Sequence, residues 1–295
     1  MGLLNQDKLK AANTGFNAHF RNGLQGVQLS WDIFAQLVPS DGESETYGWL
    51  RDLVTIREWI GQRRVQSLSQ SAYTLVNKDW EGTVGVPTKA VKRDRIGIYS
   101  APFNMLGRAV GEHPNKQVWQ LFAQGESRNG HDDVTFFNAA HPGAEGQPAW
   151  SNTAGGGGDA WYLVDNSQVI KPYVYQLEQA PEFVAKDNPE DDNVFFNKEL
   201  IYGVDYSAAF GYTFPELVRL SKEALSDTTF DAGIQAMMEL KDDRGEPLGI
   251  APTHLVVGPS NRAAAKLLIE AQLINGGDSN TNFQAVELIV SPHLA

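Results

Sequence analysis

The stretch YSAPFNMLGRAVGEHPNKQVWQLFAQG, from Tyr99 to Gly125, decides how the rest of the chain is interpreted. Its apolar residues recur largely at steps of three and four residues, the spacing of an amphipathic helix. They are Phe103, Leu106, Val110, Val118, Leu121 and Phe122. Pro114 lies mid-stretch and is expected to kink the helix, because proline removes one backbone hydrogen bond and crowds the preceding turn. The sequence therefore predicts one long, kinked helix of roughly 35 Å, at about 1.5 Å per residue.

The composition is that of a globular protein with an acidic surface. The chain has 295 residues, of which 42% are hydrophobic and 20% are charged. This length suffices for one large domain or two ordinary ones. Lys and Arg number 24 against 36 Asp and Glu, giving a formal net charge of −12. Such a charge disfavours tight binding to nucleic-acid phosphates, although it is compatible with a wall that merely surrounds nucleic acid.

Several classes of site and location are disfavoured by what the sequence lacks. It contains no cysteine, which excludes disulfides, thiolate metal sites and a cysteine nucleophile. The first residues, MGLLNQDKLKAANTGF, lack the apolar core of a signal peptide. No run approaches the roughly 20 apolar residues that a membrane span needs, so no membrane partner is expected.

The segment from Met1 to Thr46 has apolar residues that need something to pack on. Leu9, Phe16 and Phe20 are compatible with one or two short helices, and a denser apolar cluster ends at Pro39. Two interpretations stay open at this point. The segment is either an arm or the first helices of a compact domain.

The segment from Tyr47 to Ile98 reads largely as strands whose two faces are both half polar. Such strands cannot bury themselves in a monomer's core. We therefore predict a long hairpin that leans on a neighbouring subunit, with an edge hairpin on a single domain as the alternative. The candidate contact residues between subunits are Trp80, Tyr73, Arg63, Arg64, Lys92 and Arg93.

The remainder of the chain predicts an α+β body. Residues 134–143 read as a strand, and the stretch that ends in Gly155–Gly158 reads as a loop without the Lys-Ser or Lys-Thr of a phosphate-binding loop. From Trp161 onward, strands alternate with predicted helices at 215–225, 228–240 and 260–272. This order of elements predicts a mixed sheet flanked by helices.

The chemistry-bearing residues are few. His131, Asp132, Asp133 and His141 form the best metal-binding candidate, since imidazole and carboxylate ligate divalent ions. Their spacing matches no known ligand motif, and a solvated turn followed by a His-Pro corner is the favoured interpretation. We therefore predict no catalytic residues, no metal and no cofactor. The strands rich in aromatic residues, together with a hairpin that has no core of its own to pack on, instead indicate a protein that assembles with other copies.

Several stretches resemble the major head subunit, or T protein, of Mu-like phages. They are TYGWLRDLVTIREWIGQRRVQSL from Thr46, NKDWEGTVGV from Asn77, RIGIYSAPFNMLGRAV from Arg95, FFNAAHP from Phe136, IKPYVYQLEQAPEFVAK from Ile170, DDNVFFNKELIYGVDYSAAFGY from Asp191 and LGIAPTHLVV from Leu248. The likeness runs from about Thr46 to Val290 in the same order with similar gaps. This family is similar to the HK97-like capsid fold of tailed phages.

The resemblance implies a layout for this chain. Residues 1–46 would be the N-terminal arm, and residues 47–98 would contain an extended hairpin called the E-loop. Residues 99–160 would form the P domain with the spine helix at 99–125. Residues 161–295 would be mainly the A domain, a mixed sheet flanked by helices, with some strands returning to the P domain.

The resemblance also implies a function. The chain would be a structural major capsid protein of the virion, not an enzyme, assembled in the bacterial cytoplasm as hexamers and pentamers of an icosahedral shell around double-stranded DNA. A scaffold protein, a maturation protease and a portal are implied partners, and a decoration protein is a further one. The alternatives are a metal-dependent enzyme that uses the His131–His141 residues and an encapsulin-like shell of a cellular compartment.

Overall fold

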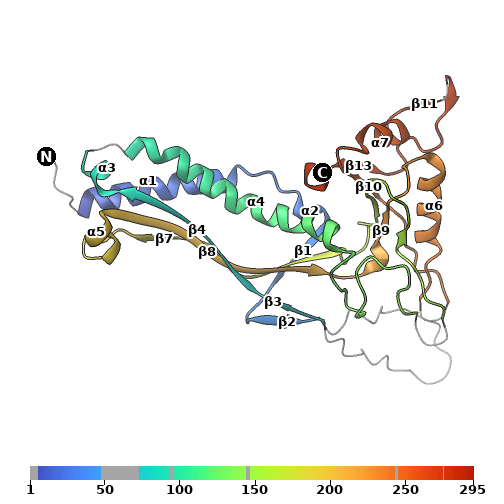
Figure 1. The fold of residues 1–295 in the computed structure, drawn as a ribbon, viewed down its shortest axis with the longest axis horizontal. Coiled ribbons are helices and arrows are strands. Elements are labelled where there is room, and N and C mark those ends of the chain that lie inside the picture. Colours follow the sequence, from blue (N-terminus) through green and yellow to red (C-terminus); the bar gives the residue numbers. More distant parts are fainter. Residues whose placement is uncertain (1–5, 48–72, 94–95, 144–146, 243–244, 275) are drawn as a thin grey trace.

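The computed structural model describes residues 6–47, 73–93, 96–143, 147–242, 245–274 and 276–295. An elongated half, in which helices lie along a four-stranded sheet, joins a compact half around a five-stranded sheet (Figure 1). The elongated half contains α1 (Gln6–Gln25), α2 (Trp31–Phe34), β1 (Ala35–Pro39), β2 (Ser44–Thr46), β3 (Thr74–Val76), β4 (Lys78–Pro87), α3 (Thr88–Lys92), the 3-10 turn η1 (Ile96–Tyr99), α4 (Ser100–Gln124), β7 (Tyr173–Lys186), α5 (Asp192–Asn197) and β8 (Glu199–Tyr212).

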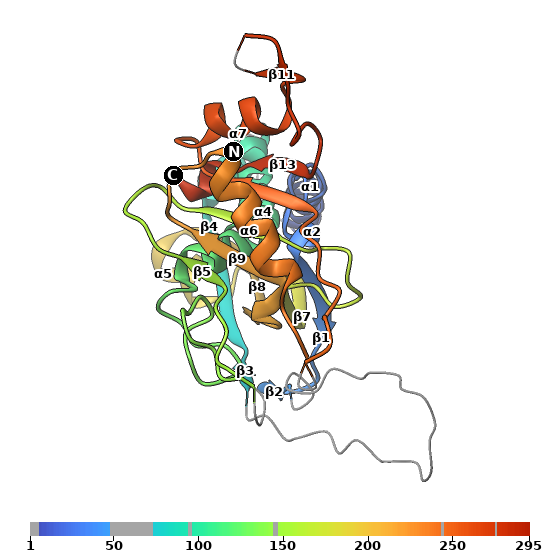
Figure 2. The same cartoon turned by 90° about the vertical axis from the view of Figure 1, so that its right-hand side faces the viewer.

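The compact half holds the remaining elements. They are β5 (Thr153–Ala154), β6 (Trp161–Val164), the 3-10 turn η2 (Pro215–Leu217), β9 (Val218–Ser221), α6 (Asp227–Met238), β10 (His254–Val257), α7 (Arg262–Ile269), β11 (Leu273–Ile274), β12 (Asp278–Ser279), β13 (Glu287–Val290) and the 3-10 turn η3 (Pro292–Leu294). The five-stranded sheet has the order β13-β10-β6-β9-β5, with α6 and α7 beside it (Figure 2). The predicted mixed sheet flanked by helices is confirmed, since this sheet holds parallel and antiparallel pairs.

The long helix predicted at 99–125 is confirmed as α4, and Pro114 lies inside it. Helix α1 lies along α4, and the two backbones meet at two glycines (Figure 1). A Cβ on Gly23 would lie 2.0 Å from the carbonyl oxygen of Asn104, so no larger residue fits there without moving a helix. Residues 6–25 therefore pack on their own chain, which favours the second interpretation of the N-terminal segment.

One face of the four-stranded sheet is buried against these helices. The sheet has the order β1-β7-β8-β4, with β1 parallel to β7 and the other pairs antiparallel. Alternate residues of β8, such as Tyr202 and Val204, are buried. The Tyr202 ring lies 5.0 Å from that of Phe16 on α1 and 5.5 Å from that of Phe103 on α4. The alternation of β8 thus directs its apolar side to the helices.

The prediction that the segment 47–98 cannot bury itself within its own chain is wrong for residues 74–87. Strand β4 pairs along its whole length with β8, and β3 pairs with β2, all within one chain. Val86 and Leu75 are 0% and 4% exposed. The small residue Gly82 gives β4 an intramolecular packing face, because the Leu106 side chain of α4 lies where a Cβ would stand. Residues 48–72, with Arg63 and Arg64, lie outside the described residues.

Two further predictions are corrected in the compact half. Residues 215–225, predicted as a helix, form the turn η2 and then strand β9, which pairs with β6 and β5. The predicted strand at 134–143 forms no strand, and its two isolated bridges join Thr135 to Asn129 and His141 to Trp150. In both places, contacts with distant segments override the local pattern, as propensity alone is a weak guide.

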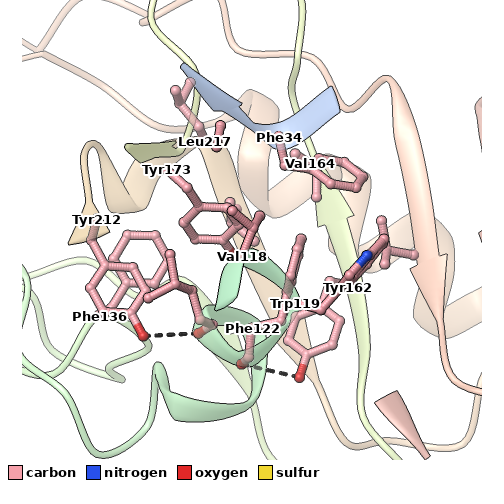
Figure 3. Close-up of a cluster of buried hydrophobic side chains, with 14 of the residues drawn as sticks. Phe34, Val118, Trp119, Phe122, Phe136, Tyr162, Val164, Tyr173, Tyr212 and Leu217 are labelled. Carbon is pink, nitrogen blue, oxygen red and sulfur yellow. Dashed lines mark hydrogen bonds between the residues drawn. The ribbon is translucent and has the colours of Figure 1, made fainter. Parts of the chain in front are cut away.

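An aromatic cluster joins the two halves. Phe122 of α4 packs on Tyr162 of β6 and on Tyr173 of β7, with ring centroids 5.0 and 4.8 Å apart (Figure 3). The Tyr162 and Tyr212 hydroxyls donate to carbonyls at the end of α4, at 3.3 and 2.8 Å. One continuous core therefore runs from α4 into the five-stranded sheet. Within the described residues, no helix combines the length and the apolar character that crossing a membrane requires.

Candidate functional site

Two of the predicted contact residues make intramolecular contacts. Tyr73 precedes β3, and its hydroxyl oxygen accepts the backbone N–H of Tyr212 at 2.9 Å. The Trp80 indole Nε1 donates to the carbonyl of Ala208 at 3.2 Å, and its ring lies 4.2 Å from that of His113 on α4. Both side chains thus help to hold β3 and β4 on their own chain, and their contact with a neighbouring copy stays a prediction.

The Trp80 contact belongs to a cluster beside the proline of α4. Gln117 Nε2 donates to His113 Nε2 at 3.1 Å, and His113 Nδ1 hydrogen-bonds to the Tyr206 hydroxyl of β8. Burial lowers the pKa of His113, and the positive charge of Lys116 lowers it further. The uncharged imidazole therefore ties α4 to β4 and β8 next to Pro114, where the helix lacks one backbone hydrogen bond.

The predicted contact residues Lys92 and Arg93 lie at a free surface. Together with Lys89 they form the basic turn, at and just after α3, at the far end of the elongated half (Figure 1). All three side chains are exposed, and none forms an ion pair within the described ranges. The structure therefore separates these cations from Tyr73 and Trp80, which are packed within the fold.

Three of the four residues of the metal hypothesis, His131, Asp132 and His141, form buried or half-buried hydrogen bonds instead of a ligand set. His141 Nδ1 lies 2.5 Å from Asp132 Oδ2, and His141 Nε2 donates to Asn152 Oδ1 at 3.0 Å. His131 Nδ1 pairs with the Thr213 carbonyl at 3.1 Å, and Asp133 has a positive φ of 68°. Over the part of the chain that the structure describes, no three His, Asp or Glu side chains come together as metal ligands.

Glu216 is the unexpected member of this polar centre. Burial raises its pKa to about 7, while His141 lowers the value and Asp132 raises it by their charges. Its Oε2 and the Asp132 Oδ1 are buried without a hydrogen-bond partner in the described structure. An unpaired buried carboxylate oxygen is costly when charged, so Glu216 is a pH-sensitive point of the fold. The sequence gives no signal for it, since Glu216 falls in the first turn of the helix that was predicted over 215–225.

A second feature that the sequence did not indicate is an exposed aromatic pair. Phe195 and Phe196 on α5 are 71% and 73% exposed, at the turn that joins β7 to β8. This turn lies at the same end of the elongated half as the basic turn (Figure 1). In a strand, one of two neighbouring rings would face the core, whereas on α5 both rings are exposed.

Comparison with known proteins gives consistent matches over nearly the whole chain. The family model described as Mu-like prophage major head subunit gpT matches residues 9–294. The major capsid protein of Escherichia phage Mu is 31% identical, over 97% of this chain and 98% of that protein. The Mu-like prophage FluMu major head subunit of Haemophilus influenzae is 33% identical, over 92% of each chain.

Solved structures agree with the sequence relatives. The chain in the procapsid of bacteriophage JBD30 superposes with a TM-score of 0.87 at 33% identity, covering 98% of this chain and 100% of that one. The chain in the JBD30 capsid gives a TM-score of 0.81 at 25% identity, with coverage of 99% and 100%. Both halves of the molecule are therefore included in the likeness.

Proposed function

Because this chain belongs to the family of Mu-like prophage major head subunits, we propose that it tiles a closed icosahedral head as hexamers and pentamers around double-stranded DNA. The chain is a major capsid protein and a structural component of the virion, and the predicted HK97-like α+β fold is confirmed. The alternatives of a metal enzyme and of a cellular compartment shell are unsupported by these relatives. We propose no enzymatic activity, and assembly in the bacterial cytoplasm.

The layout of the family is proposed for this chain as follows. The elongated half, with α4 as the spine helix, corresponds to the P domain, and most of residues 161–295 correspond to the A domain. The E-loop falls within residues 47–98, of which residues 48–72 lie outside the described residues. Within the segment 1–46, the role of an arm does not extend to α1, because this helix is held by the glycine contacts with α4.

The observation that carries this proposal is the match, over nearly the full length, to one phage's chain in two shells. The same fold occurs in the JBD30 procapsid and in its capsid. A subunit that occupies different positions in hexamers and pentamers needs a rigid body with adjustable ends. The continuous aromatic core supplies the rigid body here. Each subunit makes several contacts at once, so modest contacts suffice for a stable shell.

The partners are proposed on the same basis. A scaffold protein, a maturation protease and a portal belong to the family layout. The JBD30 capsid is also known in a form decorated with minor capsid protein trimers, and we propose that a decoration protein binds this shell too. The net charge of −12 favours a wall that encloses DNA without binding it tightly.

Expression followed by negative-stain electron microscopy tests the proposal. The chain is produced alone and together with a scaffold protein of a Mu-like phage, and closed particles of uniform diameter are expected. The folded state of the unassembled chain is checked by circular dichroism. A folded chain that stays monomeric under every condition, with scaffold present, would contradict the assignment of hexamers and pentamers.

A further inference from the structure

The outer face of the elongated sheet, turned away from α1 and α4, carries an unusual arrangement of charge. Trp80 on β4 pairs with Tyr206 on β8, and Phe183 on β7 pairs with Val204 on β8. The Trp80 and Phe183 rings contact α4 and α1. Because successive residues of a strand alternate between faces, the neighbours of these residues point the other way. The outer face therefore carries the residues next in sequence to Trp80 and Phe183, such as Glu81 and Glu182.

Three acidic residues meet on that outer face. Glu81 of β4 pairs directly with Asp205 of β8, which pairs directly with Glu182 of β7. Adjacent strands are about 4.8 Å apart, and like charges directly opposite destabilise a sheet. Asp79 follows in the next row, and Glu178 accepts a hydrogen bond from the Ser207 hydroxyl at 2.7 Å. We name these five exposed residues the acidic row: Asp79, Glu81, Glu178, Glu182 and Asp205.

No cation of the chain's described part neutralises the acidic row. None of its five members takes part in an ion pair there. The nearest cation on the same face of β7 is Lys186, four residues beyond Glu182 or roughly 13 Å along the strand. An arrangement that lowers the stability of the isolated sheet, and that nothing in the fold requires, indicates a positively charged partner.

The matching positive charge is present on the same chain, but out of reach. The basic turn of Lys89, Lys92 and Arg93 follows the end of β4. Thr88 lies seven residue steps beyond Glu81 along the extended strand. This is about 24 Å, more than two Debye lengths at physiological salt. The two charged surfaces of one chain therefore cannot neutralise each other. Two copies displaced along the long axis of the elongated half can bring them together.

We infer that the acidic row is the docking surface for the basic turn of a second copy of this chain. The contact is heterologous, since one copy offers its sheet face and the other offers its tip, and such contacts repeat from copy to copy in a closed assembly. Opposite charges set the register between the copies, and desolvation on docking strengthens them. This inference rests on the proposed shell, because only an assembly places one copy's tip beside another copy's sheet.

Charge exchange between the two surfaces tests the inference. The acid variant carries Glu182→Lys and Asp205→Lys, and the base variant carries Lys92→Glu and Arg93→Glu. Each reverses two charges, so the variant with all four substitutions keeps the net charge of −12. A control pair on the exposed side of the compact half, Asp231→Lys and Glu239→Lys, changes net charge as the acid variant does. Assembly is measured by light scattering and sedimentation, and folding by circular dichroism.

We expect each reversed pair to lower the yield of particles at least about tenfold, because like charges then face each other across the contact. The four-substitution variant should recover to within about threefold of the original chain. All variants should stay folded, and the acid variant should melt at the same temperature or higher. It turns the repulsive pair of positions 81 and 205 into an attractive one, while positions 182 and 205 remain a pair of like charges. Normal assembly of the acid variant would overturn the inference. The inference would also be overturned if the four-substitution variant gave no more particles than either two-substitution variant. An equal loss of particles in the control pair would overturn it as well. If the original chain itself fails to assemble, the shell proposal fails instead.

Discussion

Gly107 of α4 meets Phe20 of α1 so closely that a Cβ on the glycine would lie 2.0 Å from the phenylalanine carbonyl oxygen. The same helix pair is in contact again at Gly23 and Asn104. These close approaches fix the N-terminal helix on the spine helix, and they explain why residues 6–25 are part of the folded body.

We expect Gly107→Ala to lower the free energy of unfolding by roughly 1–3 kcal/mol, the cost of forcing an extra methyl group into a packed contact. Gly15→Ala is the matched control, because Gly15 lies in α1 with nothing within 4 Å of its Cβ position. That substitution should raise the free energy of unfolding by about 0.5–1 kcal/mol through helix propensity. Urea unfolding followed by circular dichroism measures both, and equal effects of the two would show that the helices do not touch at Gly107.

Trp80→Ala should destabilise the monomer, since the indole contacts His113 and hydrogen-bonds to Ala208 within its own chain. The expected loss is about 2–4 kcal/mol, somewhat below that of a fully buried tryptophan. Trp80→Phe keeps the ring and loses the Nε1 hydrogen bond, so it should cost only about 1 kcal/mol. A Trp80→Ala chain that melts like the original but fails to assemble would place the indole at a subunit contact after all.

Leu121→Asp should unfold the chain, because Leu121 is buried in the α4 face that meets the aromatic cluster. An unpaired charge there costs about 3–5 kcal/mol or more, which is a large share of the stability of an ordinary domain. Gln120→Asp is the control, since the neighbouring residue is exposed on the same helix. A cooperative melting transition in the Leu121→Asp chain, near that of Gln120→Asp, would contradict this placement.

The sequence predicted α4 well because its apolar residues lie on one face of a single continuous element. Strand β4 was harder to interpret, since its packing face is made of Trp80, Gly82 and Val84. Glycine has no side chain, so it interrupts the alternation of apolar residues by which a buried strand face is recognised. Residues 218–221 read as helical because their strand partners β6 and β5 lie far away in the chain.

The two charged surfaces also differ in how far the sequence alone reveals them. The basic turn is one short run, so Lys92 and Arg93 could be found in the sequence as candidates. Glu81, Glu182 and Asp205 are more than 100 residues apart at the extremes, and only the register of three strands brings them into one row. A sequence read without that register cannot identify the acidic row.

The pH dependence of stability should change in one specific way when Glu216 is replaced by glutamine. Burial raises the folded-state pKa of Glu216 to about 7, above the ordinary value of 4.5, so the folded state holds this proton more tightly than the unfolded state does. Its stabilising contribution is complete below pH 4.5 and is lost as the pH rises through about 7. The loss should approach about 3 kcal/mol, at 1.36 kcal/mol for each pH unit between the two values.

Glu216→Gln cannot ionise, and we expect it to remove this decline. Other titratable side chains also affect how the stability of the chain depends on pH. Burial lowers the pKa of His113 and of His254, whose contributions to stability lessen as the pH falls below 6.5. The quantity to measure is therefore the difference between variant and original chain, from chemical unfolding at intervals between pH 4.5 and 8.5. The Glu216→Gln chain should gain relative stability steadily up to about pH 7 and then level off, while Glu239→Gln, on an exposed position after α6, should show a flat difference. A flat difference for Glu216→Gln as well would mean that its carboxylate is solvated in the folded chain, and that His141 and Asp132 do not share a buried centre with it.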